Sequence, residues 1–335
     1  MVKIAVIPGD GIGPEITNAA LKVLDSLNIN LEYEFFHIGY SRLRKTGEAI
    51  SDDDIEAIKK IGIALMAPVI TPSPKEVKKY RSPVLTLRKE LDLYVNLRPV
   101  KSLPGIRSIR RNVDMVIVRE NIEGLYYGVE EKCGNGYYAL MVITEKNARR
   151  LAKFAFNYAK KHGRKKVTIV HKANVLRKTH GLFLKTCLEV AKKYPEINVE
   201  DLHVDVASMF MILKPEKFDV IITTNIFGDI LSGVCSALIG GPGLLPSANL
   251  GDKYAIFSPA HGSAPDIAGK NIANPIAMFL SAKMMLKKLG FNSEAVRIEE
   301  AIVKTLKAGI KTPDIGGKAS TTEFTKAVIK FLKEE

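Results

Sequence analysis

Three arginines lie next to apolar segments that are expected to be buried. A buried guanidinium needs an anionic partner. Arg88 and Arg98 follow the mostly apolar segments 83–87 and 93–97, and Arg119 directly follows the apolar run 113–118, which has the composition of a strand. A guanidinium can bind a carboxylate through two parallel hydrogen bonds. Three of them converging on one cleft would suit a small molecule with several carboxylates.

The alternative is that each arginine is structural and pairs with an acidic residue nearby in the sequence. For a single arginine this interpretation is favoured. The three arginines lie on separate segments, each at the end of an expected element, which favours a polyanion site. The acidic residues available for structural pairing are Glu90, Asp92 and Glu123.

Two residues are candidates for moving protons. Lys172 follows the apolar run 167–170, so it is expected at the carboxyl end of a strand, where α/β proteins place reactive groups. Desolvation or neighbouring cations can lower the pKa of such a lysine until it acts as a general base, which a surface lysine does not do. Tyr126, close in sequence to Arg119, is the candidate acid.

Two aspartates could bind a hard cation such as Mg²⁺ or Mn²⁺, which takes carboxylate oxygens. We expect Asp205 to end a strand that contains Val204, and Asp229 to lie in the stretch 228–232, where a helix is expected to begin. For Asp229 alone, helix capping is the more common role.

The loop 261–270 is rich in small residues, which would let backbone donors approach a planar ring. Asp266 in this loop could accept hydrogen bonds from both ribose hydroxyls and would repel a 2′-phosphate, so it predicts NAD rather than NADP. The stretch 9–15 resembles a dinucleotide fingerprint, but Pro14 stands where the third glycine is required. A tight turn and a cofactor contact are equally weighted interpretations there.

The elements that must position these residues alternate between strands and helices, which predicts an α/β protein with largely parallel pairing. A capping pattern, Ser320 to Glu323, marks the start of the last helix. The chain is expected to cross between two lobes at 99–104 and near 247–252, giving residues 1–99 plus 253–335 and residues 100–252. Expected strands are 3–7, 31–38, 62–66, 113–118, 167–170 and 220–223, and expected helices are 145–161, 178–193, 272–289, 293–308 and 321–333.

Composition excludes several classes of protein. No apolar stretch approaches the length of a membrane span, and no signal peptide is recognised, so we expect a soluble cytoplasmic protein. The three cysteines, 133, 187 and 235, suit neither a disulfide framework nor a zinc site. The net charge is +14, but the basic run 160–166 lacks interleaved aromatic residues, so we predict no nucleic acid partner. Absence of glutamine and plentiful lysine, isoleucine and glutamate predict a thermophilic source.

Taken together, these residues resemble the β-decarboxylating dehydrogenases, the family of isocitrate, 3-isopropylmalate and homoisocitrate dehydrogenases. The similarity runs from end to end of the chain. It is carried by the stretches 9–15, 87–88 with 96–99, 119–121, 171–174, 228–232 and 312–317.

The resemblance implies that family's two-lobed fold, a mixed sheet flanked by helices that is not a Rossmann fold. It also implies a homodimer, with a tetramer as an option, whose active site takes Lys172 and Asp205 from one subunit and Tyr126 and the arginines from the other. Substrate would be bound by Ser82, Arg88, Arg98, Arg119 and Asn174, metal by Asp205 and Asp229, and NAD by Thr71, His261, Gly262, Ser263, Ala264, Asp266, Ile267 and Asn274.

The implied chemistry is oxidation of a 2-hydroxy acid by NAD with Mg²⁺ or Mn²⁺, followed by loss of carbon dioxide. Lys172 would help to remove the hydroxyl proton, and Tyr126 would protonate the enolate that remains. In the family, the segment before the first arginine selects the substrate. Ser82 followed by Pro83 and Val84 resembles homoisocitrate dehydrogenases of lysine biosynthesis, so homoisocitrate is the predicted substrate, converted to 2-oxoadipate.

Three other interpretations remain open. Homoisocitrate and isocitrate differ by one methylene, which binding discriminates by only about 1–3 kcal/mol, so isocitrate is an alternative substrate. 3-Isopropylmalate is a more distant one. Gly233 stands where the family has a second aspartate, one helical turn after Asp229. A weakly catalytic regulatory paralogue is therefore the third interpretation.

Overall fold

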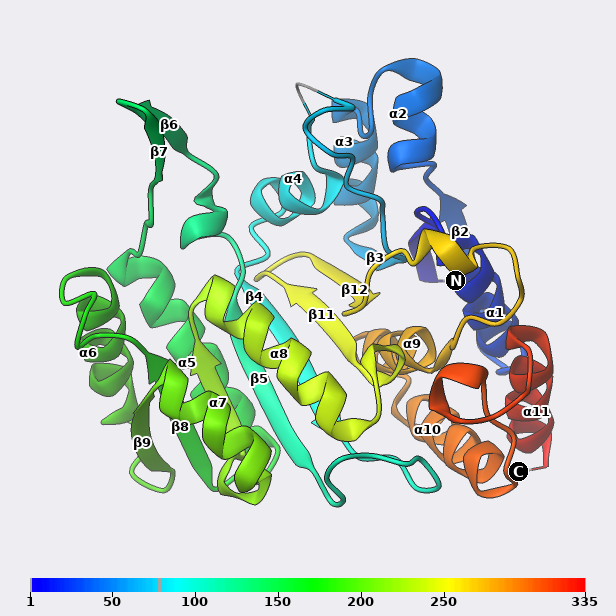
Figure 1. Cartoon of the computed structure of the whole chain (residues 1–335). Coiled ribbons are helices and arrows are strands. Elements are labelled where there is room, and N and C mark those ends of the chain that lie inside the picture. The colour runs from blue at the N-terminus through cyan, green and yellow to red at the C-terminus, as the bar shows by residue number, and fades with distance from the viewer. Residues whose placement is uncertain (1, 78–79, 335) are drawn as a thin grey trace.

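The computed structural model describes residues 2–77 and 80–334, which form one mixed ten-stranded sheet with helices on both faces, and a separate hairpin (Figure 1). The strands in sheet order are β2 (Leu31–Phe35), β1 (Val2–Ile7), β3 (Ile63–Met66), β12 (Ala255–Pro259), β11 (Pro246–Leu250), β4 (Val95–Lys101), β5 (Asp114–Glu120), β10 (Val220–Thr223), β8 (Lys166–His171) and β9 (Asn198–His203).

The sheet consists of two parallel blocks that run in opposite directions. Strands β2, β1, β3 and β12 are parallel, as are β5, β10, β8 and β9. Between the blocks, β11 pairs antiparallel with both β12 and β4, and β4 pairs antiparallel with β5. The expectation of largely parallel pairing therefore holds within each block and fails at the centre.

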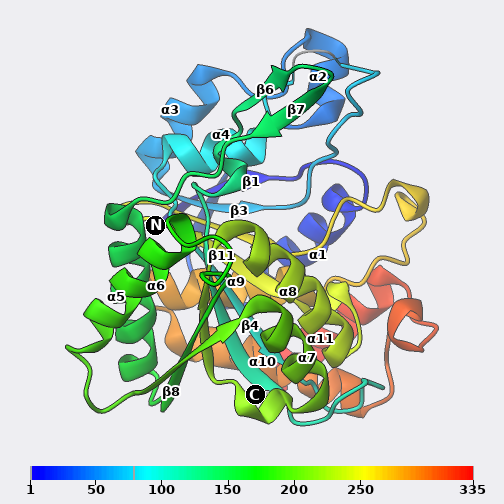
Figure 2. The ribbon, with the colours of Figure 1, turned by 60° about the vertical axis from the view of Figure 1, so that its left-hand side comes forward.

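Helices cover the two faces separately (Figures 1 and 2). Those against the face of Ile4 and Leu65 include α1, α5 and α9, whereas α3 and α4 pack against the face of Ala5 and Ile7. The helices are α1 (Gly13–Asp25), α2 (Tyr40–Thr46), α3 (Asp52–Ile61), α4 (Pro83–Glu90), α5 (Glu145–Lys161), α6 (Thr179–Ala191), α7 (Val204–Leu213), α8 (Asn225–Ile239), α9 (Ile276–Leu289), α10 (Asn292–Lys307) and α11 (Thr321–Lys333).

The expected elements are present with small shifts at their ends. Strand 220–223 and helices 145–161 and 321–333 have the expected bounds, and Ser320 and Glu323 form the expected capping box. The segment 99–104, where a crossing between lobes is expected, begins within β4, in which Pro99 pairs with Val116. The division into lobes stays a prediction. Residues 1–99 plus 253–335 contain one parallel block, and residues 100–252 contain the other.

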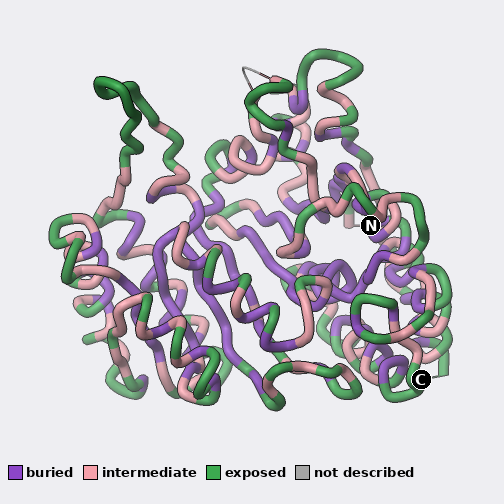
Figure 3. The backbone as a smooth tube through the Cα atoms, viewed as in Figure 1, coloured by how far each residue is buried: buried purple, intermediate pink, exposed green. Residues whose placement is uncertain are grey.

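Burial is concentrated in the central strands, which appear as a continuous buried layer in Figure 3. The hairpin of β6 (Glu130–Cys133) and β7 (Gly136–Ala139) is exposed throughout and extends away from the sheet. In the described part of the chain, no helix is both long and apolar enough to cross a membrane. Cys187 and Cys235 are buried and Cys133 is exposed, and all three are free.

Candidate active site

Two of the arginines extend from adjacent central strands onto the same face. Side chains alternate along a strand, so Asn96 and Arg98 of β4 share a face. Arg119 of β5 is directly opposite Asn96 in the register and therefore joins them. Both arginines are almost completely buried, with 6% of Arg98 and 1% of Arg119 exposed.

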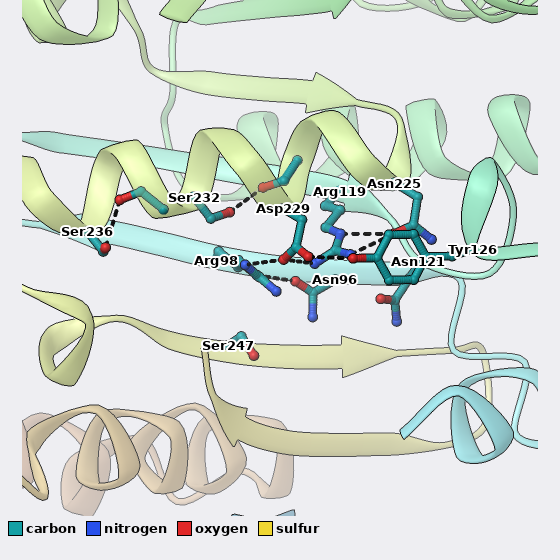
Figure 4. Close-up of polar contacts among 12 residues, drawn as sticks. Asn96, Arg98, Arg119, Asn121, Tyr126, Asn225, Asp229, Ser232, Ser236 and Ser247 are labelled. Carbon is teal, nitrogen blue, oxygen red and sulfur yellow. Dashed lines mark hydrogen bonds and ion pairs between the residues drawn. The ribbon is translucent and has the colours of Figure 1, made fainter. Parts of the chain in front are cut away.

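Helix α8 lies over this face and gives Arg119 its partners (Figure 4). Asn225 Oδ1 accepts hydrogen bonds from Arg119 Nε at 3.1 Å and Nη2 at 2.7 Å, and Asp229 Oδ1 accepts one from Nη1 at 2.5 Å. The arginine passes against Gly228, where an added Cβ would lie 2.6 Å from Arg119 Cγ. Gly228 therefore provides the space that the buried arginine occupies.

Asp229 does not cap its helix. The expected start at 228–232 is wrong, since α8 begins at Asn225 and Asp229 lies in its second turn. Its carboxylate forms an ion pair with Arg98 Nη1 at 3.3 Å and accepts a hydrogen bond from the Tyr126 hydroxyl at 2.7 Å. Although burial opposes ionisation, the arginines and this hydroxyl keep the pKa of Asp229 below its ordinary value.

Arg88 reaches the same cavity from α4, whose N-cap is Ser82. Its Nε is buried and has no hydrogen-bond partner among the described residues. Burial, together with the positive charges of Arg119 and Arg98, lowers the pKa of Arg88 to about 9. Burial and Arg119 likewise lower the pKa of Arg98 to about 10. These shifts mark positive charge that the protein itself does not neutralise.

The cavity encloses about 660 Å³ and collects nine of the predicted residues. The described residues of its lining include three arginines and one carboxylate, so their formal charges leave an excess of +2. A bound polyanion would remove both the excess charge and the unsatisfied donor. The nine residues are Thr71, Ser82, Arg88, Arg98, Arg119, Tyr126, Asp229, His261 and Gly262.

The acids expected as structural partners of the arginines are wrong, because all three are engaged elsewhere. Asp92 binds Arg150 through two hydrogen bonds of 2.5 and 2.6 Å. Glu123 accepts hydrogen bonds from the backbone and hydroxyl of Thr144, and Glu90 lies 3.9 Å from Lys59. The nearby negative charge comes instead from Asp229, which is distant in the sequence.

Buried asparagines beneath the arginines were missed by the sequence reasoning. Asn96 Oδ1 accepts a hydrogen bond from Arg98 Nε at 2.5 Å, and Asn96 Nδ2 donates to Asn249 Oδ1 at 2.9 Å. Asn121 Nδ2 donates to the same Asn249 oxygen at 3.1 Å. The available signal was Asn96 inside the apolar stretch 93–97, since buried amides require partners.

Lys172, Asn174 and Asp205 do not line the arginine cavity of the same chain. Lys172 Nζ donates to Asp205 Oδ1 at 2.5 Å. The expectation that Asp205 ends a strand is wrong, because β9 stops at His203 and Asp205 lies in the first turn of α7. The structure thus pairs Lys172 with Asp205 and leaves both apart from the arginines.

Two buried histidines fix the backbone around Lys172. His180 Nδ1 lies 3.2 Å from the Lys172 backbone nitrogen, and His171 Nδ1 lies 3.0 Å from that of Ala173. Each ring must accept these N–H groups, so each Nδ1 carries no proton. His171 Nε2 then donates to Asp201 at 3.0 Å. Burial, with a smaller effect of His171, lowers the pKa of His180 to about 4.

The glycine-rich turn 9–13 packs against the expected cofactor loop. Gly9 and Gly11 have φ of +65° and +61°, and a Cβ at Gly11 would lie 2.0 Å from the Ser263 carbonyl oxygen. The Ile12 backbone nitrogen donates to that same oxygen at 2.8 Å. The tight-turn interpretation is therefore confirmed, and the turn holds Ser263 in place.

Within the loop, His261 and Gly262 line the cavity, whereas Ser263, Ala264, Asp266, Ile267 and Asn274 do not. His261 Nδ1 lies 2.9 Å from the Gly262 carbonyl, so it donates and leaves Nε2 as an acceptor. This Nε2 is buried and has no partner among the described residues, which suits a ligand with an N–H group. Asn274 donates to Asp314 at 3.0 Å and accepts from Ile276.

No three acidic, histidine or cysteine side chains gather as a metal site within residues 2–77 and 80–334. Among the described residues that line the arginine cavity, only Asp229 offers a carboxylate, and its two oxygens already face Arg119 and Tyr126. A divalent cation there needs further oxygen ligands. The residues of one chain alone therefore do not fit the metal.

The buried His180 should make stability depend on pH in a specific direction. Unfolded, the ring takes up a proton near the ordinary pKa of 6.5, whereas folded it stays neutral down to about 4. The free energy of unfolding should therefore decrease as the pH falls through this window. We expect a smaller decrease for His180→Asn, which retains an acceptor but does not titrate, in urea unfolding at several pH values. Equal decreases in both proteins would contradict the assignment.

Comparison with known proteins agrees with this geometry. The isocitrate/isopropylmalate dehydrogenase family model matches residues 3–328. The chain is 47% identical to a 3-isopropylmalate dehydrogenase of Archaeoglobus fulgidus, covering 99% of this chain and 100% of that protein. It is 45% identical to a homoisocitrate dehydrogenase of Methanocaldococcus jannaschii, with coverage of 100% and 99%.

A solved structure of isocitrate dehydrogenase from Methylococcus capsulatus superposes with a TM-score of 0.96 at 42% identity, covering 99% of this chain and 100% of that one. The close superposition of the two structures confirms the predicted fold class, with a large mixed sheet flanked by helices. The chain therefore belongs to the isocitrate/isopropylmalate dehydrogenase family of oxidatively decarboxylating enzymes.

Proposed function

We propose that this enzyme is an NAD-dependent homoisocitrate dehydrogenase, which converts homoisocitrate to 2-oxoadipate and carbon dioxide in the α-aminoadipate route to lysine. The observation that carries the proposal is the cavity with three arginines and a single carboxylate. A tricarboxylate would offset its excess positive charge, and Arg88 Nε is available to donate a hydrogen bond to it. The Ser82 segment supports homoisocitrate among the family's substrates.

Isocitrate and 3-isopropylmalate are the alternative substrates. Relatives named for each of the three substrates match this chain at similar identity. Val84 and Leu85 also line the cavity beside Ser82, and this apolar wall would suit the branched alkyl group of isopropylmalate. A third carboxylate, in contrast, could accept a hydrogen bond from Arg88 Nε, which has no partner among the described residues.

The proton transfers follow from two residues. Tyr126 is the proposed acid, since burial and the adjacent Asp229 raise the pKa of its hydroxyl and keep it protonated. Lys172 is the proposed base at the substrate hydroxyl. When bound, NAD supplies the hydride acceptor and Mg²⁺ or Mn²⁺ polarises the substrate oxygens. Asp266, exposed in a short 3₁₀ helix, is proposed to favour NAD over NADP.

A second copy of the chain is proposed to complete the site, because Lys172 and Asp205 lie outside the cavity that their chemistry requires. A surface suited to a partner is available. In the hairpin, 79% of Tyr137 and 47% of Tyr138 are exposed. A two-stranded hairpin is marginally stable alone, so a partner surface would stabilise it. Further large apolar side chains are exposed on α7 and α8, namely Met209, Ile212, Leu213 and Ile230.

Contact with a second copy would cover these groups. Assembly into a homodimer or tetramer, a cytoplasmic location, a thermophilic source and the absence of nucleic acid partners stay predictions.

A regulatory paralogue is the second candidate from another functional class. Gly233 favours it, because the glycine removes one carboxylate from the predicted metal site.

The proposed substrate is tested by NADH formation with saturating Mg²⁺ or Mn²⁺. We expect kcat/KM for homoisocitrate to exceed that for isocitrate and 3-isopropylmalate when all three are measured side by side. Preference for another substrate would refute the role given to residues 82–86 while leaving the reaction class intact. Absence of turnover with all three would favour the regulatory interpretation.

Gly233→Asp should strengthen metal binding. No described atom outside its own helix and neighbours lies within 4 Å of a Cβ built at Gly233, so the side chain has room one turn after Asp229. We expect the Mn²⁺ concentration for half-maximal turnover to fall about tenfold, because a carboxylate is a better ligand than water. Gly233→Asn is the matched control, and an equal effect of both variants would contradict a carboxylate ligand at this position.

A further inference from the structure

A second cavity, of about 1050 Å³, lies on the opposite face of the central strands from the arginine cavity. Leu97 and Pro99 of β4 line it, and they alternate with Asn96 and Arg98, which point to the other side. Its walls come from α5 on one side and α9 on the other, both of which pack on the face away from α8 (Figures 1 and 2). Neither catalysis nor the predicted cofactor site uses this cavity.

The lining is strongly basic, with eight lysines and arginines and three acids. The acids are already engaged. Asp114 binds Arg164 at 2.5 Å, Asp252 accepts from the Tyr94 hydroxyl at 3.0 Å, and Glu299 binds Lys101 at 2.9 Å and also Lys283. The eight cationic residues are Lys101, Arg150, Lys153, Lys161, Arg164, Lys283, Lys287 and Lys288.

Four of these lysines have no ion pair with any described residue, and they face the cavity from both walls. Lys153 and Lys161 belong to α5, and Lys287 and Lys288 belong to α9. All four are exposed. Positively charged lysines without ion-pair partners repel each other across the cavity, and an anion with several charges would bridge them. The Nε of Arg150, also in this cavity, is buried without a partner among the described residues.

An aromatic surface lies beside these charges. Phe154, Tyr158 and His162 recur every four residues along α5 and its end, and all three line the cavity. The Phe154 and Tyr158 ring centroids are 6.4 Å apart, and those of Tyr158 and His162 are 4.0 Å apart, with interplanar angles of 22° and 23°. Aromatic faces of this kind stack on nucleobases. The basic run 160–166 lacks Phe, Tyr and Trp, because Tyr158 and Phe154 lie one and two turns before His162 on the helix.

We propose that this cavity binds a nucleoside polyphosphate. The lysines of α5 and α9 contact the phosphates from opposite walls, and the base packs against the aromatic surface of α5. A single phosphate would not span both walls, whereas a triphosphate offers several charges. The ligand would thereby join helices that cover different parallel blocks of the sheet.

The test is isothermal titration calorimetry of the full chain with ATP, at saturating NAD so that the cofactor site is filled. We expect binding that weakens with added salt. The variant Lys153→Gln/Lys287→Gln, with one change on each wall, should bind at least about tenfold more weakly. The matched control is Lys60→Gln/Lys193→Gln, which removes the same charge from exposed lysines elsewhere and should bind as the unaltered protein does.

Inorganic tripolyphosphate distinguishes the base from the phosphates. Weaker binding of tripolyphosphate than of ATP would support the aromatic contact, and equal binding would refute it. Failure of ATP to bind, or an equal loss in the control variant, would overturn the site. Tighter binding of a single-stranded oligonucleotide than of ATP would also overturn it, in favour of a nucleic acid surface. Turnover measured in parallel keeps this result separate from the proposed function, since none of the substituted lysines lies in the active site.

Discussion

The structure depends on holding three guanidinium groups together in a cavity that contains only one carboxylate. Like charges in a buried site repel, so the surrounding protein must hold them there. Asn225 and Asp229 fix the Arg119 fork, Asn96 holds Arg98, and Gly228 leaves the space that Arg119 occupies. The scaffold leaves an excess of positive charge, which a polycarboxylate would neutralise. Arg88 is the arginine with the fewest partners, because its Nε has none among the described residues.

The mixed topology follows from the same requirement. Arg98 and Arg119 share a face because β4 and β5 are adjacent and in an antiparallel register that sets Asn96 opposite Arg119. These central strands join the two parallel blocks, so the polar residues lie where the strand direction changes. Their opposite face carries the basic cavity between α5 and α9, so both faces of one strand pair present positive charge.

Much of this could be predicted from the sequence, because strongly periodic segments such as 145–161 and 321–333 have local signals. The arginines were found because a buried charge inside an apolar stretch is unusual, and Tyr126 was found because it lies close to Arg119 in the sequence. The start of α8, the helical position of Asp205 and the partners of the arginines were missed. The contacts between the arginines and the residues at the start of α8 span about a hundred positions, as those of Arg119 with Asn225 and Asp229 do, and no local pattern encodes them. The role of His180 was also missed, although its ring accepts a backbone N–H from the nearby loop residue Lys172.

The central claim is that the arginine cavity of one chain works with Lys172 of another. Complementation tests it most directly, using Arg88→Gln and Lys172→Met, each inactive alone. Arg88 suits this purpose because its Nε has no described partner whose loss would disturb folding. After subunit exchange, half of the dimers would be mixed and each would contain one intact site, so about a quarter of the normal turnover should return. If the mixture stays as inactive as the separate variants although exchange has occurred, the active site is not shared between chains and the account is wrong.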